Sequence, residues 1–106
     1  MIYFISDSAG HVKIGVAKNP SARMRTLQTG HPTTLVLLAS VDWPNSAERR
    51  LHSILKLERV RGEWFRHSGE IASLINHIHA GKTLKDWARA LSRGPSRLAK
   101  VLDFSR

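Results

Sequence analysis

The chain has 106 residues, which is enough for one domain with a single modest core. It contains no cysteine, so disulfides and thiolate metal sites are excluded and a reducing compartment is expected. No apolar run approaches the roughly 20 residues of a membrane span. The N-terminal residues lack the basic region and long apolar core of a signal peptide. We therefore expect a cytoplasmic protein.

Positive charge is the strongest global feature, with 17 Lys and Arg against 8 Asp and Glu and a formal net charge of +9. A field of this sign favours polyanions, and nucleic acid is the commonest polyanion in a cytoplasm. An anionic membrane is the competing partner, but the sequence has no lipidation signal and no basic helix with a Trp/Leu face. Charge thus predicts nucleic-acid binding without choosing between a nuclease, a repressor and a ribosome-associated protein.

A hairpin of two short strands is predicted at the N-terminus. Residues 1–5 are an apolar run rich in strand formers, and residues 6–10 supply turn-forming residue types. Residues 11–16 alternate between apolar and polar positions. This alternation places Lys13 on the face opposite the apolar side chains, beside the strand that carries Tyr3.

A helix is predicted next, with Asn19 as N-cap, Pro20 at the first helical position and an end near Gln28, before a glycine. Arg23 falls in its first turns, just beyond the strand that carries Lys13. From there it could bind an anion that Lys13 also faces. A solvated arginine is an equally good interpretation.

One further strand and a later helix follow from apolar patterns. Residues 34–42 are continuously apolar, which predicts a central strand. Ser68 is the expected N-cap of a helix over residues 69–80, whose apolar residues repeat with helical spacing. His77 and His79 lie near its C-terminus, where they interact well with the helix dipole. We interpret both as structural or solvated, and not as ligands.

The helix predicted from residue 45 to about 58 carries an unusual pair at its boundary. Its apolar stripe is Ala47, Leu51, Ile54 and Leu55, and its solvated face is Arg49, Arg50, Ser53 and Lys56. Glu48 and His52 lie one turn apart at the edge of that stripe, where charge is rarely held without a partner. One interpretation is packing plus a capping box between Asn45 and Glu48. The other is a cleft, to which residues 62–65 (Gly-Glu-Trp-Phe) bring a second acidic group.

A change in composition at residues 81–83 predicts a boundary. Residues 82–106 carry seven basic and two acidic residues, over half of the chain's excess positive charge. They are expected to form two short helices, roughly 84–92 and 96–104, an outline similar to a helix-turn-helix. Packing as a C-terminal helical cap is the alternative. The predicted organisation is thus a domain over residues 1–81 and a basic two-helix extension over residues 82–106.

Five short motifs follow one another in the first three quarters of the chain. They are Tyr3 in Ile2-Tyr3-Phe4-Ile5, then Lys13-Ile14-Gly15, then Asn19-Pro20 to Arg23 with Leu27-Gln28-Thr29-Gly30, then Glu48 with His52, then Gly62-Glu63-Trp64-Phe65. In this order and spacing they resemble the GIY-YIG nuclease superfamily, and more narrowly its phage-type branch, which often has KIG in place of YIG. Met1 replaces the first glycine of GIY, and the asparagine found near the last strand of many members is not evident.

The resemblance implies an α/β (α+β) fold, a small three-stranded antiparallel sheet flanked by helices, which cleaves phosphodiesters with one divalent cation. It makes Tyr3 the general base, with Lys13 or a metal-bound water favouring its phenolate. Glu48 would hold Mg²⁺ or Mn²⁺, which would stabilise the leaving oxygen. Arg23 would bind the phosphate, and His52 would orient the metal shell or a phosphate.

We therefore predict a metal-dependent DNA endonuclease of GIY-YIG type, in keeping with a phage or prophage origin. Two alternatives stay open: a catalytically weak or inactive DNA-binding module of the same fold, and an enzyme or binding factor that acts on RNA. The basic side chains expected to contact nucleic acid are Lys18, Arg25, Arg49, Arg61, Arg66, Arg89, Arg93 and Arg97.

Overall fold

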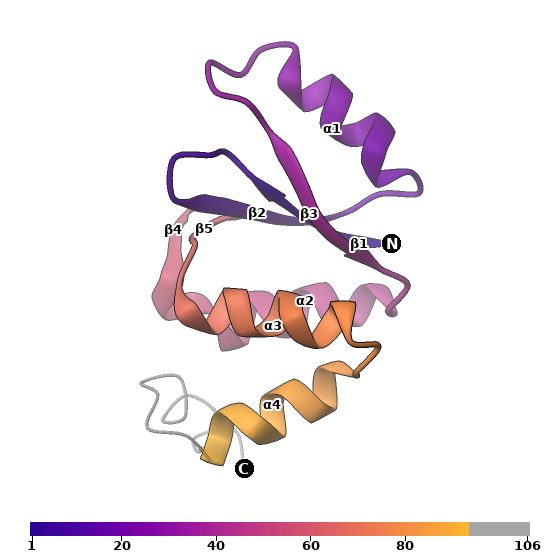
Figure 1. Cartoon of the computed structure of the whole chain (residues 1–106), viewed down its shortest axis with the longest axis vertical. Coiled ribbons are helices and arrows are strands. Elements are labelled where there is room, and N and C mark those ends of the chain that lie inside the picture. The colour runs from indigo at the N-terminus through magenta and orange to yellow at the C-terminus, as the bar shows by residue number, and fades with distance from the viewer. Residues whose placement is uncertain (94–106) are drawn as a thin grey trace.

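One antiparallel sheet separates the helices into two unequal groups (Figure 1). The computed structural model describes residues 1–93. In chain order the elements are β1 (Ile2–Ser6), β2 (His11–Val16), α1 (Pro20–Gln28), β3 (Val36–Val41), α2 (Asn45–Ile54), the 3-10 turn η1 (Lys56–Glu58), β4 (Arg59–Arg61), β5 (Trp64–Arg66), α3 (Gly69–His79) and α4 (Leu84–Arg93). Helix α1 covers one face of the sheet, α2 and α3 cover the other, and α4 lies beyond α3.

The mixed α and β fold class is confirmed, but the expected number of strands is wrong. The sheet has five strands in the order β3-β1-β2-β5-β4, and every neighbouring pair is antiparallel. The two additional strands, β4 and β5, have three residues each and form a tight hairpin around Gly62, whose φ is 56°. Such short strands, one of them fully exposed, leave no readable alternation in the sequence.

The N-terminal hairpin forms as predicted, and its side chains occupy the predicted faces. Phe4 pairs with Ile14, and both are buried in the larger core, between the sheet and helices α2 to α4. Tyr3 pairs with Gly15 on the opposite face, where it joins the smaller core under α1. Because side chains alternate along a strand, Lys13 lies on this second face as well.

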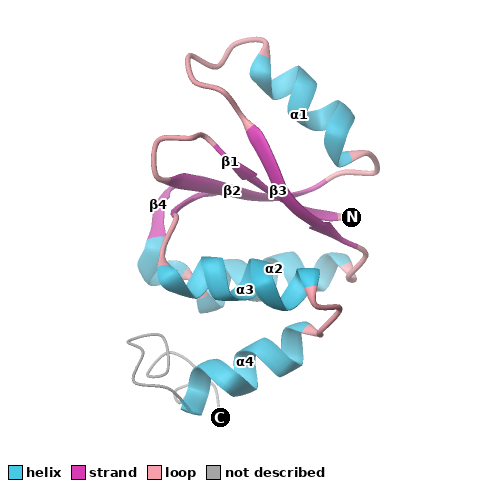
Figure 2. Ribbon diagram, in the orientation of Figure 1, coloured by secondary structure: helices cyan, strands magenta, loops and turns pink. Residues whose placement is uncertain are grey.

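Strand β3 is an edge strand, so the prediction that residues 34–42 form a central strand is wrong. It pairs with β1 alone. Its apolar character has another cause, since Leu37 packs in the smaller core and Ala39 in the larger one. Continuous apolarity here reports that helices cover both faces of the strand (Figure 2), and says nothing of how many strands flank it.

The predicted N-caps of α1 and α3 are confirmed. Asn19 accepts a hydrogen bond at the start of α1, and Ser68 does so at the start of α3. The histidines at the end of α3 are structural, as expected: His77 contacts a carbonyl one turn earlier, and His79 Nε2 lies 2.8 Å from the carbonyl oxygen of Leu38 on β3. Within residues 1–93, no helix has the length and apolar character needed to cross a membrane.

Helix α4 packs on α3 and closes the larger core. Trp87 is 1% exposed, and Ala88 is buried beside it. Thr83 and Asp86 cap the helix reciprocally, each donating its backbone N–H to the side chain of the other at 3.1 Å. The first tail helix therefore acts as a helical cap. The second predicted helix, residues 96–104, lies outside the described part of the chain, and both the boundary at residue 81 and DNA binding by the tail stay predictions.

Truncating Trp87 tests the contribution of α4 to the core. We expect Trp87→Ala to lower the free energy of unfolding of the full chain by about 3–5 kcal/mol, because it removes a large buried side chain. Urea denaturation measures this change. Arg89→Ala, exposed on the same helix, should stay within about 0.5 kcal/mol of wild type; equal effects of the two substitutions would contradict the packing described.

Candidate functional site

Polar groups from three elements meet at the edge of β2, around Ile14. The backbone N–H of Ile14 donates to the carbonyl oxygen of Glu63 at 3.0 Å, as in a continuing β2–β5 ladder. Its carbonyl oxygen is instead contacted by His52 Nε2 of α2, at 3.1 Å. The ladder is thus half-formed at this position, which brings helix α2 and the β4–β5 turn together beside one strand residue.

Three possible metal ligands come together there. Glu48 Oε1 lies 3.5 Å from His52 Nε2, and one ligand atom from each of Glu48, His52 and Glu63 lies within 4.8 Å of the others. Lys13 Nζ is 3.0 Å from Glu63 Oε1, so one carboxylate of the cluster already has a cationic partner. All four residues are partly buried, which strengthens these interactions relative to the open surface.

The capping box, one of the two interpretations of Glu48, does not form. Pro44 occupies the N-cap position of α2, and no side chain caps the helix. This places Asn45 inside the helix and Glu48 one residue too far along it to reach back to the N-terminus. The carboxylate of Glu48 turns to His52 instead. His52 is at the same time a satisfied boundary residue, because its ring also meets the ring of Phe65 edge-on at 4.9 Å.

Tyr3 approaches this edge from β1 but is enclosed. Its phenol lies over Gly15 on β2, so closely that a Cβ added to Gly15 would clash with the hydroxyl oxygen and lie 2.6 Å from ring atom Cζ. The ring therefore reaches from β1 over Gly15, the residue that follows Ile14 on β2. The residue is only 1% exposed and belongs to the smaller core.

Arg23 is the predicted site residue that the structure leaves apart. It is exposed on α1, the helix that covers the face carrying Tyr3 and Lys13. None of the side-chain hydrogen bonds and ion pairs within residues 1–93 joins it to the cluster around Ile14. Its interpretation as a solvated arginine fits the free protein, and a contact with substrate stays a prediction.

The predicted nucleic-acid contacts are mostly exposed side chains. The exposed ones are Lys18, Arg25, Arg49, Arg61 and Arg89. Arg66 is exposed too, but its Nη2 lies 2.9 Å from Oε2 of the buried Glu58, so part of its charge is already compensated. The side chain of Arg93 and the whole of Arg97 lie outside the described residues. Exposure is what a phosphate contact requires, and the contacts themselves stay predictions.

The sequence left the role of Glu63 open, and the structure supplies partners for it. Its side chain joins Lys13 and the Glu48–His52 pair. The next residue, Trp64, is the register partner of Lys13, whose Nζ lies 5.6 Å from the centre of the Trp64 ring. The only signal in the sequence was the occurrence of an acidic residue among large apolar ones after Gly62.

Comparison with protein families matches residues 1–91 to the T5orf172 domain. The chain belongs to the T5orf172 domain family. This is a phage-associated domain related to nucleases, and the match spans the sheet and most of α4. Neither the curated proteins nor the solved structures provide a match. The narrower assignment, to a GIY-YIG branch with a KIG signature, stays a prediction.

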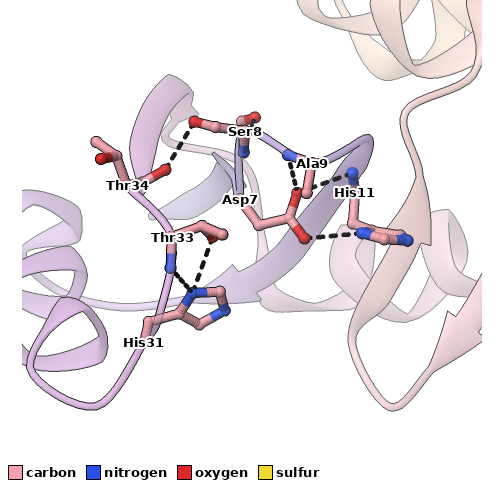
Figure 3. Close-up of polar contacts among 8 residues, drawn as sticks. Asp7, Ser8, Ala9, His11, His31, Thr33 and Thr34 are labelled. Carbon is pink, nitrogen blue, oxygen red and sulfur yellow. Dashed lines mark hydrogen bonds and ion pairs between the residues drawn. The ribbon is translucent and has the colours of Figure 1, made fainter.

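The β1–β2 loop of this T5orf172 domain is held by Asp7 (Figure 3). Its Oδ1 accepts from the backbone N–H groups of Ala9 and His11 at 2.8 and 3.0 Å, and its Oδ2 lies 2.7 Å from His11 Nδ1. Burial opposes ionisation of Asp7, but the hydrogen bonds from Ala9 and His11 outweigh it, so the pKa of Asp7 lies below the usual value for Asp. Ser8 joins this loop to the one before β3 by donating to the carbonyl of Thr34 at 2.7 Å.

Filling the space above Gly15 tests the position of the Tyr3 phenol. We expect Gly15→Ala to lower the free energy of unfolding by about 1–3 kcal/mol, the range for overpacking a close-fitting interior. Chemical denaturation measures it. Gly30→Ala is the matched control, because a Cβ there meets nothing within 4 Å. The cost of Gly15→Ala should fall in a Tyr3→Leu background; an unchanged cost would show that the phenol does not occupy this space.

Asp7→Asn should destabilise the T5orf172 domain in a pH-dependent way. Hydrogen bonds to a charged group contribute about 1.5–3 kcal/mol, and we expect a loss of that order at pH 7. Because the pKa of Asp7 is depressed on folding, the unfolded chain binds the proton more readily than the folded one. The contribution is therefore fully present above the unfolded-state pKa, about 4, and is lost as pH falls through the lower folded value.

Urea denaturation of wild type and Asp7→Asn between pH 7 and pH 3 measures that dependence. The difference between them should shrink on acidification below about pH 4. Asp42→Asn is the control, since Asp42 is exposed just after β3. A difference that stays constant over the whole range would show that ionisation of Asp7 does not stabilise the loop.

Proposed function

We propose that this T5orf172 domain is a metal-dependent endonuclease that hydrolyses phosphodiester bonds of DNA. The observation that carries the proposal is the meeting of Glu48, His52, Glu63 and Lys13 around Ile14 of β2. The phenol of Tyr3 lies over the next residue of that strand, Gly15. Membership of a nuclease-related family and a net charge of +9 support nucleic acid as the substrate.

The residues present fit a divalent metal ion. Glu48 and Glu63 offer carboxylate oxygens close enough to share one ion, and such hard ligands suit Mg²⁺ or Mn²⁺. His52 Nε2 lies near two oxygens, of Ile14 and Glu48. That pattern assigns the proton to Nε2, which makes His52 a donor that orients Glu48 rather than a ligand. A bound ion would neutralise charge that develops on the phosphate and on the leaving oxygen.

The remaining residues supply proton transfer and phosphate binding. Tyr3 would accept a proton from the water that attacks phosphorus, while the bond to the leaving 3′ oxygen breaks and that oxygen is protonated from solvent. Lys13 lies on the same face of the sheet, two residues before Gly15 on β2, and its charge would favour the phenolate form of Tyr3. Arg23 would bind non-bridging phosphate oxygens from α1 through its planar guanidinium.

The burial of Tyr3 favours a second candidate function. A phenol that is 1% exposed has little access to an attacking water. The same fold without efficient catalysis would still present exposed Lys and Arg side chains on several elements. A DNA-binding module with weak or absent cleavage is therefore the alternative that experiment has to separate from the nuclease, and an RNA substrate is the other.

Nicking of supercoiled plasmid in the presence of Mg²⁺ or Mn²⁺ tests the proposal. We expect wild type to nick the plasmid, and Glu48→Gln and Tyr3→Phe to be slower by about 100-fold or more, the scale of losing a general base. Asp42→Asn, which removes an exposed carboxylate outside the cluster, should retain the wild-type rate.

Binding of Mn²⁺ measured by calorimetry gives a second readout that does not depend on turnover. Glu48→Gln should abolish it, and Asp42→Asn should not. If wild type and variants are equally inert while all bind DNA with a steep salt dependence, the binding module replaces the nuclease. Faster cleavage of RNA than of DNA in a competition assay would show that RNA, and not DNA, is the substrate.

A further inference from the structure

A hollow in the surface lies outside the metal cluster. It has a volume of about 240 Å³ and is lined by Asp7, His11, His31, Val60, Arg61 and Trp64. These residues come from the β1–β2 loop and the first residue of β2, from the loop that follows α1, and from the β4–β5 hairpin. Arg61 is the only lining residue that the sequence predicted to contact nucleic acid, and no residue of the metal cluster lines the hollow.

Trp64 connects the hollow to the candidate site. It pairs with Lys13 in the β2–β5 register, and it directly follows Glu63. The ring of His31 lies 5.7 Å from the Trp64 ring and is inclined to it by 36°, so the two rings form a wedge and not a stacked pair. Trp64 is only partly buried, and together with Val60, which is 55% exposed, it makes an apolar wall of the hollow.

The polar groups of the hollow suit an anionic ligand with hydrogen-bonding edges. Arg61 is exposed and takes part in none of the four ion pairs within residues 1–93. Asp7 is already bonded to His11 and to two backbone N–H groups, so it offers no open site for a cation.

Both histidine rings are held at Nδ1, that of His11 by Asp7 and that of His31 by Thr33 (Figure 3). Since Nδ1 donates in the first case and accepts in the second, Nε2 is the atom of each ring left to contact a ligand.

We propose that this hollow binds an unpaired nucleobase and its phosphate, with the base against Trp64 and the phosphate at Arg61. Aromatic stacking beside a cation is the chemistry by which proteins hold single-stranded nucleic acid. A base inside a duplex cannot present its face, so the ligand is a single-stranded, frayed or flipped nucleotide. The inference rests on the proposed function for one point only, that this nucleotide flanks the phosphodiester to be cut.

A simpler explanation covers part of the same surface. Exposed charges on β4, an edge strand, hinder pairing with another chain. That explains Arg59 as well as Arg61. It gives no reason for an accessible tryptophan inside a hollow whose other walls carry two oriented histidines, and this combination is what the nucleotide accounts for.

Quenching of 2-aminopurine in a short single-stranded DNA oligonucleotide tests the proposal. The full chain carries Glu48→Gln and is assayed without divalent metal, so cleavage does not interfere. Trp64→Leu should weaken binding about five-fold or more and abolish the quench, because it removes the stacking face. Trp64→Phe, which keeps an aromatic ring, should retain most of both, and binding of a blunt duplex should be unchanged.

Arg61→Gln is expected to reduce the slope of log affinity against log salt by about one for the single strand. Arg59→Gln is its matched control on the same strand, because Arg59 pairs with Phe65 and does not line the hollow. An RNA oligonucleotide of the same sequence shows whether ribose or deoxyribose is preferred. The proposal of a nucleotide in the hollow is compatible with preference for either sugar.

Wild-type affinity and quench in Trp64→Leu, or an equal loss for single strand and duplex, would overturn the proposal. If Trp64→Leu does not fold, Arg61→Gln against Arg59→Gln decides it. If binding depends on Trp64 but the protein never nicks plasmid, the nuclease proposal is wrong and the nucleotide-binding proposal stands. If nicking depends on Glu48 but the Trp64 and Arg61 variants bind like wild type, the nucleotide-binding proposal is wrong and the nuclease proposal stands.

Discussion

The peptide group of Ile14 is the contact on which the candidate site depends. Its N–H continues the ladder to the β4–β5 hairpin, while its carbonyl leaves the ladder and binds His52 of α2. A complete ladder pair would satisfy that carbonyl within the sheet, and the imidazole would lose its anchor. A shift of one residue in register would move Lys13 to the core face and its apolar neighbours to the other. The point at which β5 stops pairing with β2 therefore decides which polar groups contact Ile14.

The site is assembled across an edge of the sheet, between two cores that form separately. Tyr3 and Lys13 belong to the face under α1, whereas Glu48 and His52 come from α2, which packs on the opposite face. The apolar clusters on the two faces hold the strands and α2 in place, and the polar contacts around Ile14 then position the side chains of the site. Gly15 is the one residue of β2 without a side chain, and the phenol of Tyr3 occupies the space that a side chain there would fill.

Local chemistry predicted what is local in this fold. The bounds of α1 followed from Asn19 and Pro20, and the hairpin followed from strict alternation. The position of β3 did not, because apolarity measures coverage by helices and not strand order. The partnership of Lys13 with Glu63 spans fifty residues and leaves no periodic signal. The sequence indicated the chemistry of each candidate site residue. The distances between these residues depend on the β4–β5 hairpin, which is too short for a pattern in the sequence to predict.

The two carboxylates of the cluster lie close together, and each has a partner of its own. Like charges at this separation repel strongly in a partly buried setting, but Glu63 is paired with Lys13 and Glu48 with His52. Under the proposed function, a divalent ion held by both carboxylates would take over that role. Lys13 Nζ lies 3.0 Å from Glu63 Oε1 and 5.6 Å from the centre of the Trp64 ring, and under the proposed function the same charge would also act on the phenol of Tyr3 or on a phosphate. One ammonium group thus connects the carboxylate cluster with the aromatic residue of the proposed nucleotide hollow.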